Sequence, residues 1–167
     1  MSQTAALSRP RAGDVLFLVL LGVVVMLFAG FTAAYMIRRP SPDWTPVAIP
    51  AWSWIGTGFL AVSSVTLEFA RKRESAGLTR VSLLLGCGFL AAQLFSWSEL
   101  AQGGTTLPTT PHGAFYFMLS AVHGLHLVGG LCALVWVTLR ERPVRLVAAY
   151  WHFMGLIWLY VLFLLAS

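Results

Sequence analysis

The sequence predicts an all-α integral membrane protein, a bundle of five transmembrane helices. Of its 167 residues, 58% are hydrophobic and only 10% are charged, whereas a soluble domain carries roughly 25% charged residues. Uncharged runs long enough for a helix to cross a bilayer, which takes about 20 residues, recur five times. No alternating barrel pattern is visible, and helices satisfy their own backbone groups in hydrocarbon. No separate soluble domain is expected.

The first apolar run, residues 15–37, follows a tail at residues 1–14 and ends before a pair of arginines. Two arginines also precede the run, as basic residues do in a signal peptide. The apolar stretch of a signal peptide is only about 7–15 residues long, however. We therefore expect this segment to remain as a transmembrane helix.

The other four spans are expected at residues 51–69, 81–100, 114–139 and 146–166, which makes residues 15–167 one transmembrane domain. The first loop contains four prolines and the third contains glycines and prolines, and both residue types interrupt helices. The fourth loop is a tight basic turn, so the last two spans must be antiparallel neighbours.

The distribution of basic residues predicts the orientation. The N-terminal tail and the second and fourth loops hold nine Lys and Arg residues, while the first and third loops and the C-terminus hold two. Because cytoplasmic loops carry the excess of Lys and Arg, the N-terminus is predicted to be cytoplasmic and the C-terminus periplasmic. The cations lie in short clusters between apolar runs, so no nucleic-acid partner is expected.

The fourth span carries the most informative polar residues. His123, His126 and Gly130 recur at helical spacing along one stripe. The glycine lets another helix approach, and the two imidazoles are expected to hydrogen-bond across that interface. Ligation of haem b or of copper is the alternative. Haem ligation between helices needs opposed histidines at matching depth, whereas His152 lies near the cytoplasmic end of its span, so we expect no metal.

Other polar and sulfur-bearing residues of the spans have simpler interpretations. Glu68 is expected to reach the cytoplasmic interface and pair with Arg71 or Lys72. Cys87 and Cys132 have no CxxC spacing and are expected to be small buried hydrophobic residues. Contacts between helices are expected for the polar side chains of the third span: Gln93, Ser96 and Trp97.

Four short motifs lie in order on four of the predicted spans. Residues 115–130, FYFMLSAVHGLHLVGG, contain an aromatic pair, His-Gly-x-His and a later glycine. With Ser120 and Ala121 in place of a Thr-Gly pair, they resemble the fourth-span signature of subunit III of haem-copper respiratory oxidases. The closing helix of that family is similar to Tyr150-Trp151-His152-Phe153 with Trp158. Its second and first spans are similar to Ser63-Ser64-Val65-Thr66 and to Met26-Leu27-Phe28 with Ala34-Tyr35.

The resemblance covers nearly the whole chain beyond the first dozen residues, and it is to the five-helix bacterial form, which lacks the first two helices of longer members. It implies an accessory protein of the bacterial inner membrane that acts in aerobic respiration. Such a subunit has no catalytic residues and binds no haem or copper, which belong to subunits I and II. It supports subunit I, proton uptake there, and bound phospholipid. The positions expected at structural, lipid or subunit I contacts are Ser63, Ser64, Thr66, Gln93, Ser96, His123, His126, Gly130, Trp151 and His152.

The chain departs from the family at three buried carboxylates, whose positions hold Val24, Ser96 and Gly155. Glu99 lies about 4.5 Å further along the helix than Ser96; it is expected on roughly the same face and is the one candidate for a proton-related role. These departures favour scaffolding and lipid binding over proton collection. Three alternatives stay open: an accessory subunit of a nitric oxide reductase, a self-sufficient haem b cytochrome, and a small transporter or channel. The electron donor, cytochrome c or quinol, also stays open.

Overall fold

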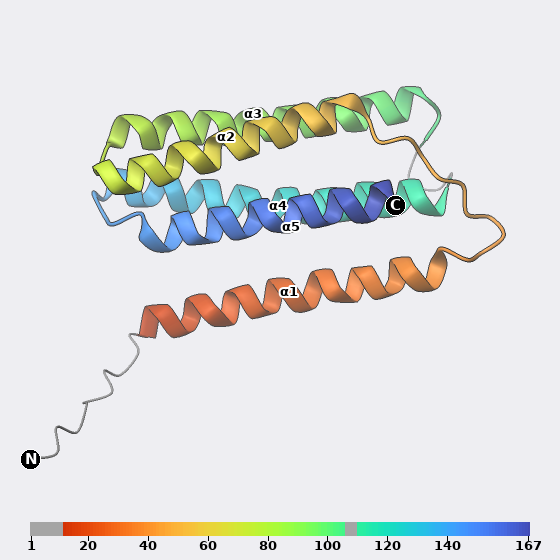
Figure 1. The fold of residues 1–167 in the computed structure, drawn as a ribbon, viewed down its shortest axis with the longest axis horizontal. Helices are drawn as coiled ribbons and strands as arrows, with labels where there is room; N and C mark the ends of the chain where they lie inside the picture. Colours follow the sequence, from red (N-terminus) through yellow and green to blue (C-terminus); the bar gives the residue numbers. More distant parts are fainter. Residues whose placement is uncertain (1–11, 106–109) are drawn as a thin grey trace, which may run out of the picture.

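The computed structural model describes residues 12–105 and 110–167, and its regular elements there are five α-helices (Figure 1). They are α1 (Ala12–Arg38), α2 (Ala51–Arg73), α3 (Ala76–Gln102), α4 (Pro111–Leu139) and α5 (Arg145–Ala166). The predicted all-helical, five-helix architecture is confirmed. Most of the predicted tail, at residues 1–11, lies outside the described residues.

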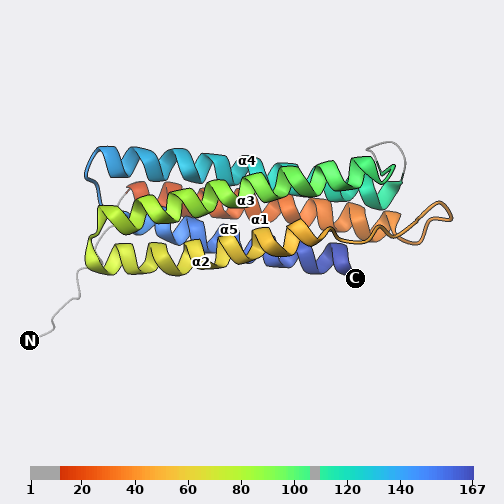
Figure 2. The same ribbon diagram turned by 90° about the horizontal axis from the view of Figure 1, so that it is seen from above.

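Four of the helices, α1, α3, α4 and α5, are long and apolar enough to cross a membrane. The remaining helix, α2, has 23 residues and is the most polar of the five in composition. At 1.5 Å per residue it is still long enough for a bilayer core of about 30 Å. It runs alongside the others (Figure 2), so its polar character distinguishes it more than its length does.

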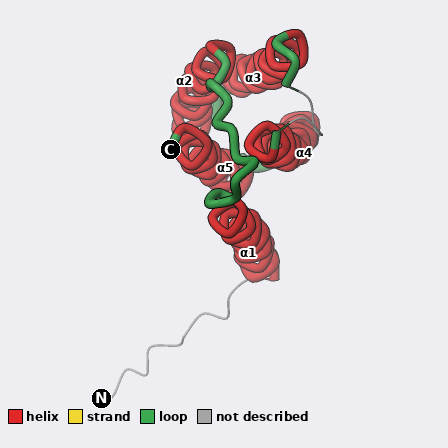
Figure 3. Tube along the Cα trace, turned by 90° about the vertical axis from the view of Figure 1, so that its right-hand side faces the viewer, coloured by secondary structure: helices red, strands yellow, loops and turns green. Residues whose placement is uncertain are grey.

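Helices α2, α3, α4 and α5 form a four-helix bundle, and α1 lies outside it against α4 and α5 (Figure 3). Successive helices run in opposite directions, so α4 and α5 are antiparallel neighbours, as predicted. With five helices, α1 begins at one end of the bundle and α5 finishes at the other (Figure 1). This arrangement fits a chain whose ends lie on opposite sides of a membrane. Which end is cytoplasmic stays a prediction.

Local capping explains where the helices begin and end. After the basic last turn of α2, Glu74 adopts a left-handed conformation with φ of 50° and ends the helix. The next residue, Ser75, caps α3 by accepting the backbone N–H of Leu78. Thr110 caps α4 in the same way, with Pro111 as the first helical residue. The helices therefore extend a few residues beyond the apolar spans into polar sequence.

The attachment of α1 is lighter than that of the other helices. Only Val24, Phe28 and Tyr35 are buried among its described residues. Two polar contacts join α1 to α5: Asp14 with Arg145 (2.9 Å) and Thr32 with Tyr160 (2.7 Å). A third joins the residues just after these helices, Arg39 and the backbone oxygen of Ser167 (2.5 Å). The four-helix bundle thus has a core of its own, to which α1 is pinned.

Candidate functional site

The α4 stripe of His123, His126 and Gly130 faces three different neighbours. The imidazole of His123 is fully buried in the bundle, with ring centroids 5.6 Å from Phe89 of α3 and 5.0 Å from Trp158 of α5. His126 is half-buried and turns towards α1. Gly130 packs against α5. The stripe is therefore divided between the bundle core and the seam with α1.

The expectation that both imidazoles hydrogen-bond across the interface is wrong. Neither ring nitrogen of His123 has a hydrogen-bond partner among the described residues, because its contacts there are with aromatic rings. Nδ1 of His126 lies 2.8 Å from the backbone oxygen of Val122, one turn earlier on the same helix. The bond that does cross to α5 is donated by the hydroxyl of Tyr150 to the backbone oxygen of His126, at 3.1 Å.

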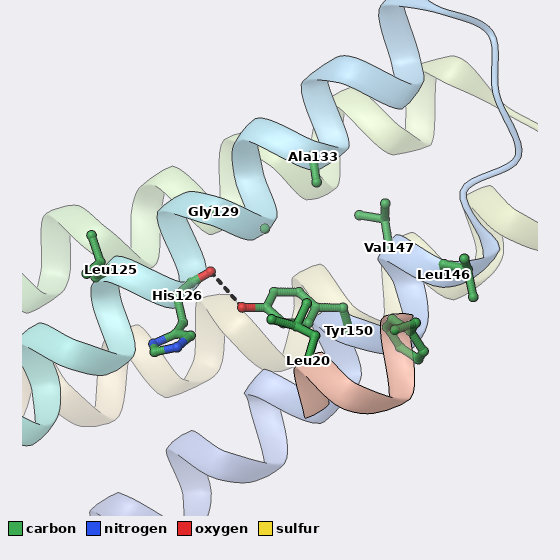
Figure 4. A pocket seen from close by; sticks show the side chains of 10 residues that line it. Leu20, Leu125, His126, Gly129, Ala133, Leu146, Val147 and Tyr150 are labelled. Atoms are coloured by element: carbon green, nitrogen blue, oxygen red, sulfur yellow. Dashed lines mark hydrogen bonds between the residues drawn. The ribbon is translucent and has the colours of Figure 1, made fainter. Parts of the chain in front are cut away.

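An apolar cavity of about 450 Å³ lies where α1, α4 and α5 meet, and we call it the α1–α4–α5 cavity (Figure 4). Leu20, Leu125 and Val147 line it together with Gly129, which adds no side chain. The Tyr150–His126 hydrogen bond lies at its edge. Among the described residues, no charged side chain lines this cavity. Its chemistry suits a hydrocarbon chain better than an ion.

Trp151 of α5 is the anchor of the bundle and is completely buried. Its indole N–H donates to Ser63 Oγ of α2 at 3.1 Å, and Ser63 in turn donates to the backbone oxygen of Ser82 on α3 at 2.8 Å. The ring lies against Gly130 of α4 and Gly86 of α3. One side chain therefore joins all four helices of the bundle.

A second set of buried polar groups lies towards the opposite end of the bundle. Tyr116 of α4 is central: its hydroxyl accepts from Nε2 of Gln93 at 3.1 Å and shares a hydrogen bond with Ser53 Oγ at 2.6 Å. Ser53 also bonds to Ser96 Oγ at 3.1 Å. Close by, the indole of Trp97 donates to Ser120 at 2.9 Å. Hydrogen bonds satisfy these buried groups and connect α2, α3 and α4.

The predicted pairing of Glu68 is confirmed. Its carboxylate lies 2.5 Å from Arg71 and 3.6 Å from Lys72. His152 of α5 is the third neighbour, with Nε2 at 3.6 Å. All four side chains are partly exposed, so this is a solvated charge cluster that bridges the ends of α2 and α5.

His112, which no sequence pattern singled out, contacts two backbone groups that are far from it in the sequence. The residue is only 3% exposed. Its Nδ1 accepts a hydrogen bond from the backbone N–H of Val47 at 3.0 Å. Because Nδ1 is the acceptor, Nε2 carries the proton and donates to the backbone oxygen of Leu165 at 3.0 Å. Tyr35 and Trp44 pack around the ring. The residue precedes the apolar run of its span, and no spacing rule links it to its two distant partners.

Comparison with known proteins decides the family. No protein-family model matches the chain. A probable cytochrome c oxidase subunit 3 from Nocardia farcinica is 30% identical to it, over 92% of this chain and 87% of that protein. The chain belongs to the cytochrome c oxidase subunit 3 family. A cytochrome c oxidase subunit 3 from Corynebacterium diphtheriae is also 30% identical, over 94% of this chain and 88% of that protein. One from Synechocystis is 29% identical, over 92% of this chain and 72% of that protein.

This confirms the family that the motifs predict, and the structure locates the three positions at which the resemblance implies a carboxylate that this chain lacks. Val24 is completely buried on α1, and Ser96 is completely buried and bonded to Ser53. Gly155 faces Ser64 of α2. Two of the three positions, Val24 on α1 and Ser96 in the bundle, are thus fully buried, where an unpaired carboxylate would be costly.

Glu99, the candidate for a proton-related role, and Ser96 lie in different surroundings. Glu99 is exposed, whereas Ser96 is fully buried. The expectation that the two side chains share a face is wrong in this case: Glu99 is rotated by about 60° around the helix axis from Ser96, and the edge of the buried face of α3 falls between them. Cys87 and Cys132 are likewise exposed rather than buried. Within the described ranges, no three His, Cys, Asp or Glu side chains come together as a metal site.

Proposed function

We propose that this chain is a non-redox accessory subunit of a haem-copper terminal oxidase in aerobic respiration. The observation that carries the proposal is the 30% identity to a probable cytochrome c oxidase subunit 3 over 92% of the chain. The buried polar network supports it, because the hydroxyl and amide groups of α2, α3 and α4 are used to hold helices together. On this proposal the haems and copper belong to subunits I and II.

The contribution of this chain is then structural. It lies in the bacterial inner membrane with its N-terminus in the cytoplasm, contacts subunit I, and stabilises that subunit and its proton uptake. The positions Val24, Ser96 and Gly155 supply no carboxylate, so this chain is a poor collector of protons. Scaffolding is the larger part of the proposed role.

Phospholipid binding is the second part of the role, and the α1–α4–α5 cavity supports it. Its volume of about 450 Å³ and its apolar lining fit part of an acyl chain. Lipid tails are as apolar as leucine, so burial from water gives no driving force inside a bilayer. Binding would come from the van der Waals contacts of a filled cavity.

The test is purification of the chain from its native membranes in mild detergent. We expect it to elute with a large haem-bearing polypeptide that reduces dioxygen, and to show no Soret band when isolated. A partner that reduces nitric oxide would identify the accessory-subunit alternative. A Soret band kept by the isolated chain and lost in His126→Leu would instead establish a haem b cytochrome. Transport by the chain alone in liposomes would establish the transporter.

A further inference from the structure

Helices α2 and α5 lie side by side, with α2 on the side of α5 away from α1 (Figure 3). A groove lies between these two helices. Its volume is about 290 Å³. Small or polar residues form part of its lining: Thr57, Ala61 and Ser64 from α2, and His152 and Gly155 from α5. The rest of the lining is apolar and consists of Leu60, Leu156, Trp158 and Leu159. We call it the α2–α5 groove.

The α2–α5 groove offers hydrogen-bonding groups that the α1–α4–α5 cavity does not. The hydroxyl of Ser64 makes no hydrogen bond within the described part of the chain. His152 has one polar neighbour there, the carboxylate of Glu68 at 3.6 Å. In the apolar cavity, by contrast, the Tyr150 hydroxyl and Nδ1 of His126 are already bonded to backbone oxygens.

One end of the groove is basic. Glu68 lies one turn beyond Ser64 on α2, and the last turn of that helix carries Arg71, Lys72 and Arg73. Two of these cations, Arg71 and Lys72, pair with the Glu68 carboxylate. A partner segment that placed an acidic side chain at this end would find an opposite charge, whereas a second basic segment would be repelled.

Such a surface is costly to leave against lipid. Hydroxyl, imidazole and carboxylate groups in membrane helices usually face another helix or water. The groove follows α2, the helix whose composition does not by itself qualify as a membrane span. Its polar edge is therefore better covered by protein than by acyl chains.

We infer that the α2–α5 groove is the surface through which this chain docks on the large subunit of the oxidase, by receiving one transmembrane helix of that subunit. Ala61 and Gly155 let a helix approach closely, and Ser64 and His152 offer hydrogen bonds to it. The basic end selects a helix with a carboxylate at the matching end. The inference rests on the proposed function and adds to it the place of contact.

Photo-crosslinking of the assembled complex tests the inference. Benzoylphenylalanine is placed at Leu156, which lines the α2–α5 groove and is 66% exposed, or at Leu125, which lines the α1–α4–α5 cavity and is 71% exposed. We expect protein adducts with the large subunit from Leu156 and lipid adducts from Leu125. Adducts from Leu156 with lipid alone, or with a second copy of this chain, in an intact complex would overturn the inference. If no haem-bearing partner is recovered before irradiation, the proposed function fails as well.

A steric pair of variants gives an independent readout. Ala61→Phe fills the groove, whereas Val62→Phe enlarges the neighbouring residue, which is 54% exposed and does not line the groove. We expect Ala61→Phe to lower the fraction of this chain retained with the large subunit during size-exclusion chromatography by roughly tenfold. Val62→Phe should behave as wild type. Equal retention of the two variants would contradict the inference.

Discussion

Gly86 of α3 lies against the indole ring of Trp151 of α5 so closely that a Cβ on the glycine would be 2.7 Å from the ring. Real Cβ atoms essentially never make such a contact. The close approach brings the indole N–H to Ser63 and lets the Trp151 side chain reach α3 from α5, which lies between α2 and α4. The position of α5 therefore depends on the absence of a side chain at Gly86 of α3.

Gly86→Ala is expected to destabilise the bundle by about 1–3 kcal/mol, the usual cost of overpacking, reduced by the roughly 1 kcal/mol that alanine gains over glycine in a helix. The matched control is Gly88→Ala on the same helix, where the new Cβ would meet Phe59 at an ordinary 3.5 Å. Unfolding in detergent measures both. Because Trp151→Phe removes the ring atoms that collide, Gly86→Ala should cost less in that background; an unchanged cost would contradict the packing argument.

His112→Leu should lower the free energy of unfolding by roughly 2–6 kcal/mol, since it leaves two backbone groups, the N–H of Val47 and the oxygen of Leu165, without their partner and each costs about 1–3 kcal/mol. The connection between the first loop and the end of α5 should loosen with it. Protease sensitivity of the first loop measures this effect. Wild-type resistance in the variant would show that the imidazole is not what holds these segments.

Acidification should weaken the same contact. The neutral imidazole of His112 accepts from Val47 through Nδ1, but a protonated ring carries hydrogens on both nitrogens and cannot accept. The stabilisation is therefore present at higher pH and lost as the pH falls. A pH series of thermal unfolding should show a slope in the wild type that is smaller in His112→Leu. Parallel curves for the two proteins would refute this assignment.

His123→Leu should leave stability within about 1 kcal/mol of the wild type, although the residue is fully buried. Its two ring nitrogens have no partner among the described residues, so leucine removes an unsatisfied polar group while losing aromatic contacts worth roughly 0.5–1.5 kcal/mol. The comparison with His112→Leu in the same unfolding assay is informative because both histidines lie on α4. A large loss for His123→Leu would indicate a partner for its imidazole, such as a metal or another subunit.

Gly129→Leu should reduce the phospholipid that copurifies with the chain. A Cβ at Gly129 meets nothing within 4 Å, and the residue lines the α1–α4–α5 cavity. A leucine side chain there would fit without a clash and would fill part of the volume proposed to bind an acyl chain. Gly30→Leu on α1, which is equally open and lies outside the cavity lining, is the control. Native mass spectrometry counts the lipids bound. Equal counts for both variants would place the lipid elsewhere.

The helices could be predicted from the sequence because apolar runs and basic loops are local signals. The pairing of Glu68 with Arg71 and Lys72 was equally accessible, since residues three and four apart share a helix face. The extension of α2 to Arg73 was not predicted, because a run defined by hydropathy ends at the basic residues that follow Phe69, whereas the helix continues through them and ends before Glu74.

The contacts between helices were harder to predict because they depend on how each helix is rotated. The motif around His126 indicated a glycine-lined interface but not that its imidazole would bond to Val122 on its own helix. Ser96 and Glu99 are another example: Glu99 is rotated by only about 60° around the axis of α3 from Ser96, yet Ser96 is buried and Glu99 is exposed. The partners of His112 lie 65 and 53 residues away along the chain, beyond the reach of any local pattern.

The light attachment of α1 has a consequence for biogenesis. The surface that receives this helix is made by α4 and α5, which are synthesised after α1, so α1 must wait in the bilayer until both have been made. A helix that waits alone in lipid has to be apolar on every side, and α1 is by hydropathy the most apolar of the four clear spans. Helix α1 is thus inserted before the two helices on which it docks.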